Sequence, residues 1–225
     1  IMTRPVVFWC IVLVVAMDIK LRDCRMCDLY KLPGQVVPGE GPKDAEYMFV
    51  AEAPGAEEAL RGRPLIGPSG KRFDLLLKVG DFDREKCYVT NLLKHRTPRN
   101  RKPKVAEINV CDQWLKQELE WVRPRIIVAL GATAAEWFVG HRVAMKKEHG
   151  MPRALTIAQW GGLFVAMYHP AAVFRNPNLW AVMVEDFKLL PSRVTTATER
   201  VTPVWKTLMT PKELMEALCV NLQLY

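Results

Sequence analysis

The chain has 225 residues, of which 50% are hydrophobic and 25% are charged, and its 13 glycines and 16 prolines follow no period. This composition excludes a disordered or collagen-like chain and suits one globular domain with a sizeable core. Lysine and arginine number 32 against 24 acidic residues, and the resulting charge of +8 fits a polyanionic partner. The 6 cysteines are too few and too unevenly spaced for a disulfide scaffold.

An apolar run occupies residues 6–17, behind the single basic residue Arg4. The run is too short to span a bilayer as a helix, although its length suits the core of a signal peptide. The chain opens with Ile1, and Met17 begins a polar stretch typical of a natural start. We therefore expect residues 1–16 to be a non-native or removed leader, with an exported or membrane-associated protein as the alternative.

From residue 45 onward, buried-looking apolar runs alternate with amphipathic segments. In chain order the pattern predicts strand Tyr47–Ala51, helix Lys71–Val79, strand Cys87–Thr90, a loop at 93–104, helix Val105–Val122, strand Arg125–Leu130, a short helix from Thr133, strand Leu163–Tyr168 and helix Leu179–Leu190. Ser69 is the expected N-cap of the first helix. Helices between buried strands indicate an α/β fold whose parallel sheet is covered on both faces.

Three polar residues of different chemistry stand at predicted strand ends: Glu52, Asn91 and His169. Each alone has an ordinary explanation, because Asn and Glu commonly cap turns and a lone His is commonly a satisfied polar group. Ligands of open α/β sheets, however, gather beyond the carboxyl ends of the strands. Together, the three residues indicate a functional site on one edge of the sheet.

Four motifs in family order make the stretch from Cys24 to Leu190 resemble the family 4, or iron–sulfur, uracil-DNA glycosylases. The first motif consists of paired cysteines, a Gly-Glu-Gly turn and a stretch that resembles the family's GEAPG, with Ala51 in place of its first Gly. The other three motifs resemble GRPFVGxAG, YITNVVKCRPPGNRxP and YHPAALLRNP. The matching stretches are CRMCDLYK (24–31) with PGEGPKDAEYMFVAEAPG (38–55), GRPLIGPSG (62–70), YVTNLLKHRTPRNRKP (88–103) and YHPAAVFRNP (168–177). The resemblance implies a three-layer α/β/α fold with a four-stranded parallel sheet. It also implies hydrolysis of the N-glycosidic bond of deoxyuridine in DNA.

The resemblance implies a role for each residue at the sheet edge. Asn91 matches the Asn that reads flipped uracil, because a carboxamide offers the donor and acceptor that uracil O4 and N3–H require. His169 matches the histidine that donates a hydrogen bond to uracil O2 as the departing base gains charge. Glu52 matches the motif acid, which positions the attacking water or stabilises the cationic sugar.

The pocket wall departs from the family at one position. Ala53 is expected to border the uracil pocket through its backbone, and Leu65 stands where the family has a Phe that stacks on the base. Leucine supplies an apolar wall without a π-face. Since base–aromatic stacking contributes ~1–3 kcal/mol, weaker uracil binding or broader base choice is expected.

Loops and helix starts are the expected DNA contacts. Ser69 and Lys71 open a helix whose free N–H groups suit a phosphate. The loop from Lys94 to Lys104 is basic and without acid, so beside a DNA edge it favours phosphate binding over a merely solvated loop. Its basic residues are Lys94, Arg96, Arg99, Arg101, Lys102 and Lys104, with Arg99 and Arg101 the expected contacts. In HPAAVFR (169–175), similar to the family's minor-groove loop, the expected wedges and phosphate ligand are Val173, Phe174 and Arg175.

The resemblance also implies a metal site. Cys24 and Cys27 form a C-x2-C pair, and His95 replaces the Cys of the family's KCRPP motif at an unchanged spacing from Cys111. The implied ligands of a 4Fe–4S cluster are therefore Cys24, Cys27, His95 and Cys111, because imidazole can ligate cluster iron. A Cys3His zinc site and an empty, degenerate site are the alternatives. Cys87 is expected in the core, or as a stand-in ligand.

A covalently DNA-trapping branch of the superfamily also has His at the position of His95, but uses a further His from an inserted KRIH motif. Residues 96–104 contain no His, so ordinary turnover is expected.

We expect residues 17–192 to form the glycosylase domain and residues 193–225 a C-terminal extension. Within the extension, Thr210 and Pro211 begin an amphipathic helix that weakly resembles the start of a polymerase 3′–5′ exonuclease domain. The extension is then the start of a truncated further domain, or a helix packed on the first one. The expected partner is uracil-containing DNA, single- or double-stranded, bound by a cytoplasmic monomer without membrane contact. A catalytically weak iron–sulfur DNA-binding relative is the alternative function.

Overall fold

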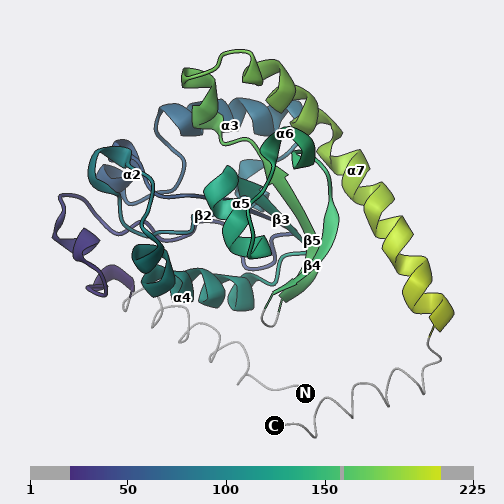
Figure 1. Ribbon diagram of the computed structural model, residues 1–225, viewed down its shortest axis with the longest axis horizontal. Helices are drawn as coiled ribbons and strands as arrows, with labels where there is room; N and C mark the ends of the chain where they lie inside the picture. Colours follow the sequence, from purple (N-terminus) through teal and green to yellow (C-terminus); the bar gives the residue numbers. More distant parts are fainter. Residues whose placement is uncertain (1–20, 158–159, 209–225) are drawn as a thin grey trace, which may run out of the picture.

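The computed structural model describes residues 21–157 and 160–208, which form three layers with a sheet between two layers of helices (Figure 1). Within these residues the sheet has five strands in the order β2-β1-β3-β5-β4. Their bounds are β1 Tyr47–Ala51, β2 Tyr88–Asn91, β3 Ile126–Leu130, β4 Arg153–Ile157 and β5 Trp160–Met167. The strands β2, β1, β3 and β5 run parallel, so the predicted four-stranded parallel sheet is confirmed.

The sequence missed one strand, the antiparallel edge strand β4, which pairs with β5. Its residues are alternately half-buried and exposed, so it lacks the continuous apolar run of the inner strands. The beginning of β5 was also missed, because it contains Gly161 and Gly162 and glycine is unfavourable inside strands. Gly162 is needed there: a Cβ would lie 2.6 Å from the carbonyl oxygen of Arg125 on the neighbouring chain segment.

The helices largely follow the predicted segments. Their bounds are α2 Ala56–Arg61, α3 Pro68–Val79, α4 Val105–Val122, α5 Ala132–Val139, α6 Met145–Glu148 and α7 Leu179–Leu208, with 3-10 turns η1 Asp28–Lys31, η2 Arg84–Lys86, η3 Pro98–Asn100 and η4 Pro170–Phe174. The assignment of Ser69 as N-cap is wrong. Gly67 is the N-cap of α3, since Pro68 takes the first helical position, where its missing N–H costs nothing.

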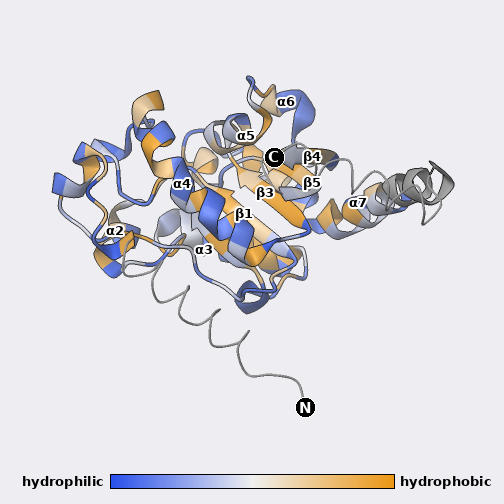
Figure 2. Cartoon of the chain, turned by 90° about the horizontal axis from the view of Figure 1, so that it is seen from below, coloured by the Kyte–Doolittle hydropathy of each residue, from blue (hydrophilic) through white to orange (hydrophobic). Residues whose placement is uncertain are grey.

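Each face of the sheet carries its own core, and the inner strands β1 and β3 are largely hydrophobic in Figure 2. On one face Met48 and Val50 of β1 pack with α4 and α5, through Leu115 among others. On the other face Phe49 packs with α3 and α7, where its ring lies edge-on to Phe73. Burial on both faces explains the near-continuous apolar strands.

Helix α7 is longer than predicted, spanning 30 residues. Pro191 does not end it, because Val194 is buried in the second core and Ala197 packs against it, so tertiary packing holds the next turns. The domain boundary expected after residue 192 therefore falls inside a helix. The leader expected at 1–16 and the helix expected from Thr210 lie outside the described residues. No helix in the described part of the chain is long and apolar enough to cross a membrane.

Candidate active site

The carboxyl ends of the parallel strands bring the three polar residues to one edge of the sheet. Asn91 ends β2 and is in register with Ala51, the last residue of β1, so Glu52 follows directly. His169 follows β5 after one residue. At ~4.8 Å per strand, the span from β2 to β5 is about 14 Å, which side chains from both ends can bridge around one ring. The predicted juxtaposition along one edge is present in the fold.

Asn91 is buried, with 1% of its surface exposed. Its backbone carbonyl accepts a hydrogen bond from Lys94 Nζ at 2.9 Å, whereas its side-chain Nδ2 has no partner among the described residues. A buried donor left unpaired costs ~1–3 kcal/mol. The amide is therefore held ready for an acceptor that a ligand would bring.

His169 is fixed in one tautomer by the chain that follows it. Its Nδ1 accepts the Ala171 N–H at 3.0 Å, as the cap of η4. Burial lowers the pKa of His169 to about 4; Glu58 opposes this shift, and Arg175 adds to it. The imidazole is thus neutral near pH 7, and with Nδ1 accepting, its proton lies on Nε2. His169 presents a neutral N–H donor to the sheet edge.

Gly131, directly after β3, makes room for this histidine. Its φ is +96°, and a Cβ there would lie only 3.2 Å from the Cβ of His169. The Gly131 N–H also donates to the carbonyl of Met167 at 2.7 Å, which joins the ends of β3 and β5. A glycine directly after a buried strand is the sequence signal that indicates such a close approach.

Glu52 and Ala53 continue the edge from β1. The Glu52 carbonyl accepts the Leu93 N–H at 3.1 Å, which extends the pairing beyond the strands. Its half-buried carboxylate has no hydrogen bond or ion pair to any residue that the structure describes. Ala53 is half-buried against the first core. The carboxylate is thus available to a substrate or water.

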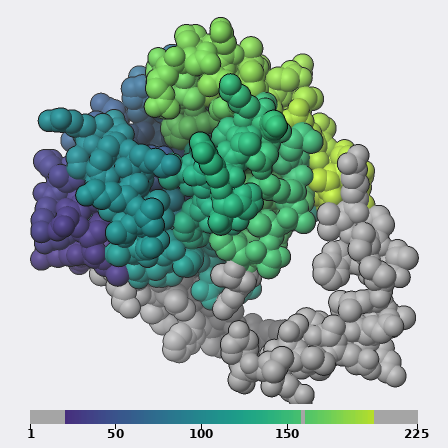
Figure 3. Space-filling view, viewed as in Figure 1, coloured from purple at the N-terminus to yellow at the C-terminus, as the bar shows by residue number. Residues whose placement is uncertain are grey.

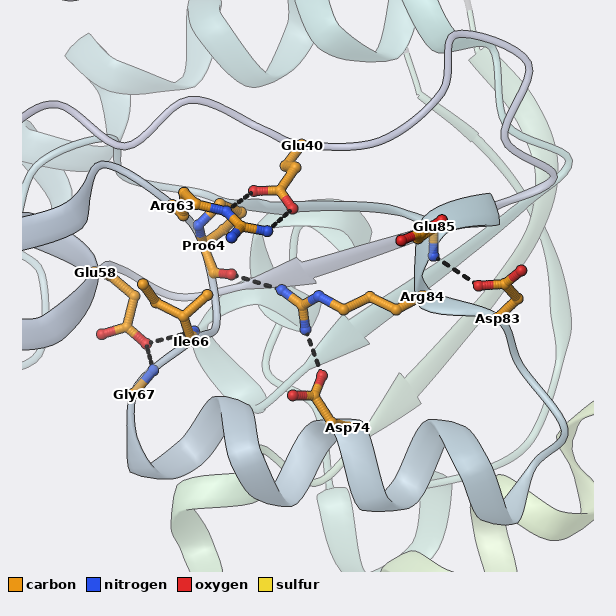
Figure 4. A network of polar contacts seen from close by, with 10 residues as sticks. All are labelled: Glu40, Glu58, Arg63, Pro64, Ile66, Gly67, Asp74, Asp83, Arg84 and Glu85. Atoms are coloured by element: carbon orange, nitrogen blue, oxygen red, sulfur yellow. Dashed lines mark hydrogen bonds and ion pairs between the residues drawn. The ribbon is translucent and has the colours of Figure 1, made fainter.

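Glu58, in α2, is a buried carboxylate that sequence reasoning missed. Its Oε1 accepts the N–H groups of Ile66 at 3.1 Å and Gly67 at 2.9 Å (Figure 4). These amides follow Leu65, whose φ of +48° is unusual for a leucine. Glu58 therefore fixes the loop that carries Leu65. The neighbouring Glu57 is exposed, and nothing in the sequence distinguishes the two.

The same loop is held from its other side. Arg63 binds both oxygens of Glu40, at 2.7 and 2.6 Å, and Arg84 donates to the Pro64 carbonyl and to Asp74, both at 2.8 Å (Figure 4). Leu65 is itself buried in the second core. The contacts on both sides define the position of its backbone.

Lys94 contradicts one prediction. Its side chain is 0% exposed, and Nζ binds Glu118 and Thr90 at 2.6 Å each besides the Asn91 carbonyl. The expectation that Lys94 binds phosphate is therefore wrong, because a buried ammonium needs its charge partner and lies under the end of β2. Elsewhere in the loop Arg99 is exposed, whereas both terminal nitrogens of the Arg101 guanidinium donate to the Glu107 carboxylate.

In the loop after β5, Val173 is 6% exposed in the second core and does not reach the surface, so its expected wedge role is wrong. Phe174 is 53% exposed and Arg175 is also exposed. At the start of α3, Lys71 is exposed and Ser69 half-buried.

Three of the four predicted metal ligands, Cys24, Cys27 and Cys111, belong to the first core. Cys24 and Cys111 are buried and Cys27 is half-buried; the Cys111 sulfur accepts the Lys94 N–H at 3.3 Å. Burial raises the pKa of Cys111 to about 11, and the nearby Cys27 and Cys24 add to the rise. His95 Nδ1 is buried without a hydrogen-bond partner in the described residues, and burial lowers the pKa of His95.

A cavity of about 550 Å³ is lined by both Cys24 and His95. No three Cys, His, Asp or Glu side chains in the described ranges are grouped so that they could hold one metal ion. Cys87 packs in the second core, on the opposite face of the sheet, so it is a core residue and not a stand-in ligand.

The family model of the uracil-DNA glycosylase superfamily matches residues 38–188. The chain belongs to this superfamily. A type-4 uracil-DNA glycosylase of Archaeoglobus fulgidus is 38% identical over 175 residues, which cover 75% of this chain and 87% of that protein. A type-4 uracil-DNA glycosylase of Saccharolobus solfataricus is 37% identical over 175 residues, covering 75% and 81%. A DNA polymerase of Bacillus phage SP01 is 29% identical over 155 residues, which cover 68% of this chain and 16% of the polymerase.

The superfamily match includes every residue of the sheet-edge site: Glu52, Ala53, Glu58, Leu65, Asn91, Gly131 and His169. It begins after Cys24 and Cys27. The edge therefore lies within the part that the superfamily shares, and half of the predicted metal ligands lie outside it.

Proposed function

We propose that this protein releases uracil from DNA by hydrolysing its N-glycosidic bond, leaving an abasic site. Membership of the uracil-DNA glycosylase superfamily supports the reaction class. The observation that carries the proposal is the buried, unpaired amide of Asn91 on the same edge as the neutral N–H donor of His169. One group recognises the base and the other stabilises it as it leaves.

The target base has to leave the helix before these groups can reach it. In the flipped position, Asn91 Nδ2 donates to uracil O4 and Asn91 Oδ1 accepts the N3–H. Cytosine presents a donor and an acceptor in the reverse order, so it leaves both amide atoms unpaired. Ala53 and Leu65 border the ring.

Cleavage breaks the bond between N1 of uracil and C1′ of the sugar, and the bonding electrons leave with uracil. His169 Nε2–H donates to O2 as that oxygen gains charge, a contribution of the order of 3 kcal/mol for one well-placed donor. The sugar becomes cationic and takes up water. The Glu52 carboxylate either positions this water or stabilises the cation.

We further propose that Cys24, Cys27, His95 and Cys111 hold a 4Fe–4S cluster. The unpaired His95 Nδ1 and the clustered thiols support a metal group at this place. A single zinc ion needs its ligands at ~2.0–2.3 Å, whereas a cluster of four irons takes one ligand on each of separate metal atoms. When bound, the cluster would join the segment before β1 to the β2–α4 region. Iron and acid-labile sulfide analysis tests this; zinc without sulfide would contradict it.

DNA is the proposed partner, single- or double-stranded, bound by a cytoplasmic monomer. The proposed DNA contacts are Ser69, Lys71, Arg99, Arg101 and Arg175, together with Phe174 as the wedge at the base step. Residues 17–192 would form the catalytic unit and residues 193–225 an extension.

The test is a strand-cleavage assay on an oligonucleotide with a single uracil. Wild type should produce alkali-sensitive breaks at uracil, and Asn91→Ala and His169→Ala should each lower the rate ~100- to 1,000-fold. Asn109→Ala and His141→Ala, at exposed positions, are the matched controls. Binding without breaks by wild type would favour the alternative, a catalytically weak DNA-binding relative.

A further inference from the structure

One cation and two aromatic rings form an unassigned cluster beside the His169 loop. The Arg72 guanidinium carbon, on α3, lies 4.7 Å from the ring centre of Phe174 and 6.0 Å from that of Trp180. Phe174 ends η4, and Trp180 lies at the start of α7. The three elements contact one another, and the segment with η4 and the start of α7 lies on the surface, light green at the top of Figure 3.

Arg72 has no acidic partner in the described part of the chain, unlike Arg84, which pairs with Asp74 on the same helix. A guanidinium over an aromatic face is held by that face, while its N–H groups, which lie in its own plane, stay free to donate. Arg72 is thus positioned by two rings and still has the donors for a phosphate.

Phe174 is more than half exposed although its neighbour Val173 is buried. Exposure of a large ring does not stabilise the fold, and Arg72 already covers one side of this ring. A ring supported on one side and open on the other can stack its open face on the base beside the vacated position.

We propose that Arg72, Phe174 and Trp180 act as one DNA-binding unit, in which Arg72 binds the phosphate beside the flipped nucleotide and holds Phe174 in the vacated base step. The proposal rests on the proposed function and adds Arg72 and Trp180 to it. Trp180 supports the guanidinium from α7. Only a duplex has a stack to refill, so the unit assists cleavage in double-stranded DNA more than in single strands.

The test compares kcat/KM on single- and double-stranded substrates with the same uracil. Phe174→Ala should lower the duplex rate about tenfold or more and the single-strand rate by a clearly smaller factor. Arg72→Met, which keeps the stem without the planar charge, should lower the duplex rate similarly and the single-strand rate less. Arg72→Lys should restore the single-strand rate but not the duplex rate, because lysine keeps the charge and loses the stacking plane.

Coupling is measured with the double variant Arg72→Met/Phe174→Ala. If Arg72 acts through Phe174, the fold-loss of the duplex rate in the double variant should be well below the product of the two single-variant losses. A 2-aminopurine placed next to uracil should brighten on wild-type binding and less so with either single variant. Lys78→Met, an exposed site at the far end of α3, is the matched control.

Additive losses, an unchanged duplex-to-single-strand ratio, or unaltered 2-aminopurine brightening would overturn the unit while wild type still releases uracil. Failure of wild type on single strands as well would instead overturn the proposed function.

Discussion

The sheet edge and the region of the predicted metal ligands Cys24, Cys27, His95 and Cys111 differ in which of their side chains the protein's own hydrogen bonds fix. At the edge, Ala171 fixes the His169 tautomer and Lys94 holds the backbone carbonyl of Asn91, whereas the Asn91 side-chain Nδ2 has no partner among the described residues. Among the predicted metal ligands, burial raises the pKa of the Cys111 thiol and leaves His95 Nδ1 unpaired. The fold thus fixes the histidine of the edge, His169, through a hydrogen bond to its Nδ1, whereas the histidine among the predicted metal ligands, His95, has no such bond in the described residues.

Lys94 joins the two regions. Its ammonium reaches the end of β2 at Asn91, and its backbone N–H reaches the Cys111 sulfur in α4. The bonds from Lys94 and Thr90 to Glu118 Oε2, and from the Gly39 N–H to Oε1, complete the buried group. A buried ion pair is a weak source of stability, so its value here is in fixing the geometry of both regions.

The largest expected effect comes from breaking this connection. Lys94→Met leaves the buried Glu118 carboxylate without its cation, which should lower the free energy of unfolding by ~3–5 kcal/mol, measured by chemical denaturation. Lys94→Met/Glu118→Leu should recover much of that stability without restoring the uracil-release rate, because Asn91 is no longer held. Full recovery of the rate would show that the pair serves stability alone.

The next effect concerns the cavity alone. His95→Cys restores a four-thiolate set and should raise the iron and acid-labile sulfide per chain, whereas His95→Ala should lower both. Cys87→Ser, in the opposite core, is the control and should leave them unchanged. Equal metal content in wild type, His95→Cys and His95→Ala would exclude His95 as a ligand.

A smaller effect is expected in the pH dependence of stability, to which His169 at the edge contributes. The pKa of His169 is about 4 in the folded protein and near 6.5 when it is unfolded, so the unfolded chain binds the extra proton. The free energy of unfolding should therefore fall as the pH drops from about 6.5 to about 4, on account of this group. His169→Gln should show a shallower fall in denaturation curves; an identical slope would contradict the shift.

The smallest change is in the pocket wall. Leu65→Phe supplies the missing π-face and should lower KM for uracil-containing DNA. Stacking would add up to ~1–3 kcal/mol to binding, and the cost of placing a larger ring in a packed site reduces that gain. Steady-state kinetics on single strands measures it. Leu65→Met, of similar volume, is the control; equal KM values would exclude stacking at this position.

The sequence predicted the inner strands, the long helix Val105–Val122 and the polar residues at the strand ends, because burial on both faces and helical periodicity are local properties of the chain. It missed β4, whose half-exposed edge position leaves no apolar run, and the full length of α7, which packing of Val194 extends past Pro191. It also missed the inward turn of Lys94, the role of Glu58 and the contact of Arg72 with Phe174.

The sequence by itself therefore determined which chemical groups stand at the strand ends, since residue types and their order are properties of the chain. The tertiary structure alone decided which charges are paired and buried and which remain free, because a lysine at the end of a strand can turn into the core or into solvent. That choice depends on partners distant in the chain: Glu118 for Lys94, and Phe174 with Trp180 for Arg72.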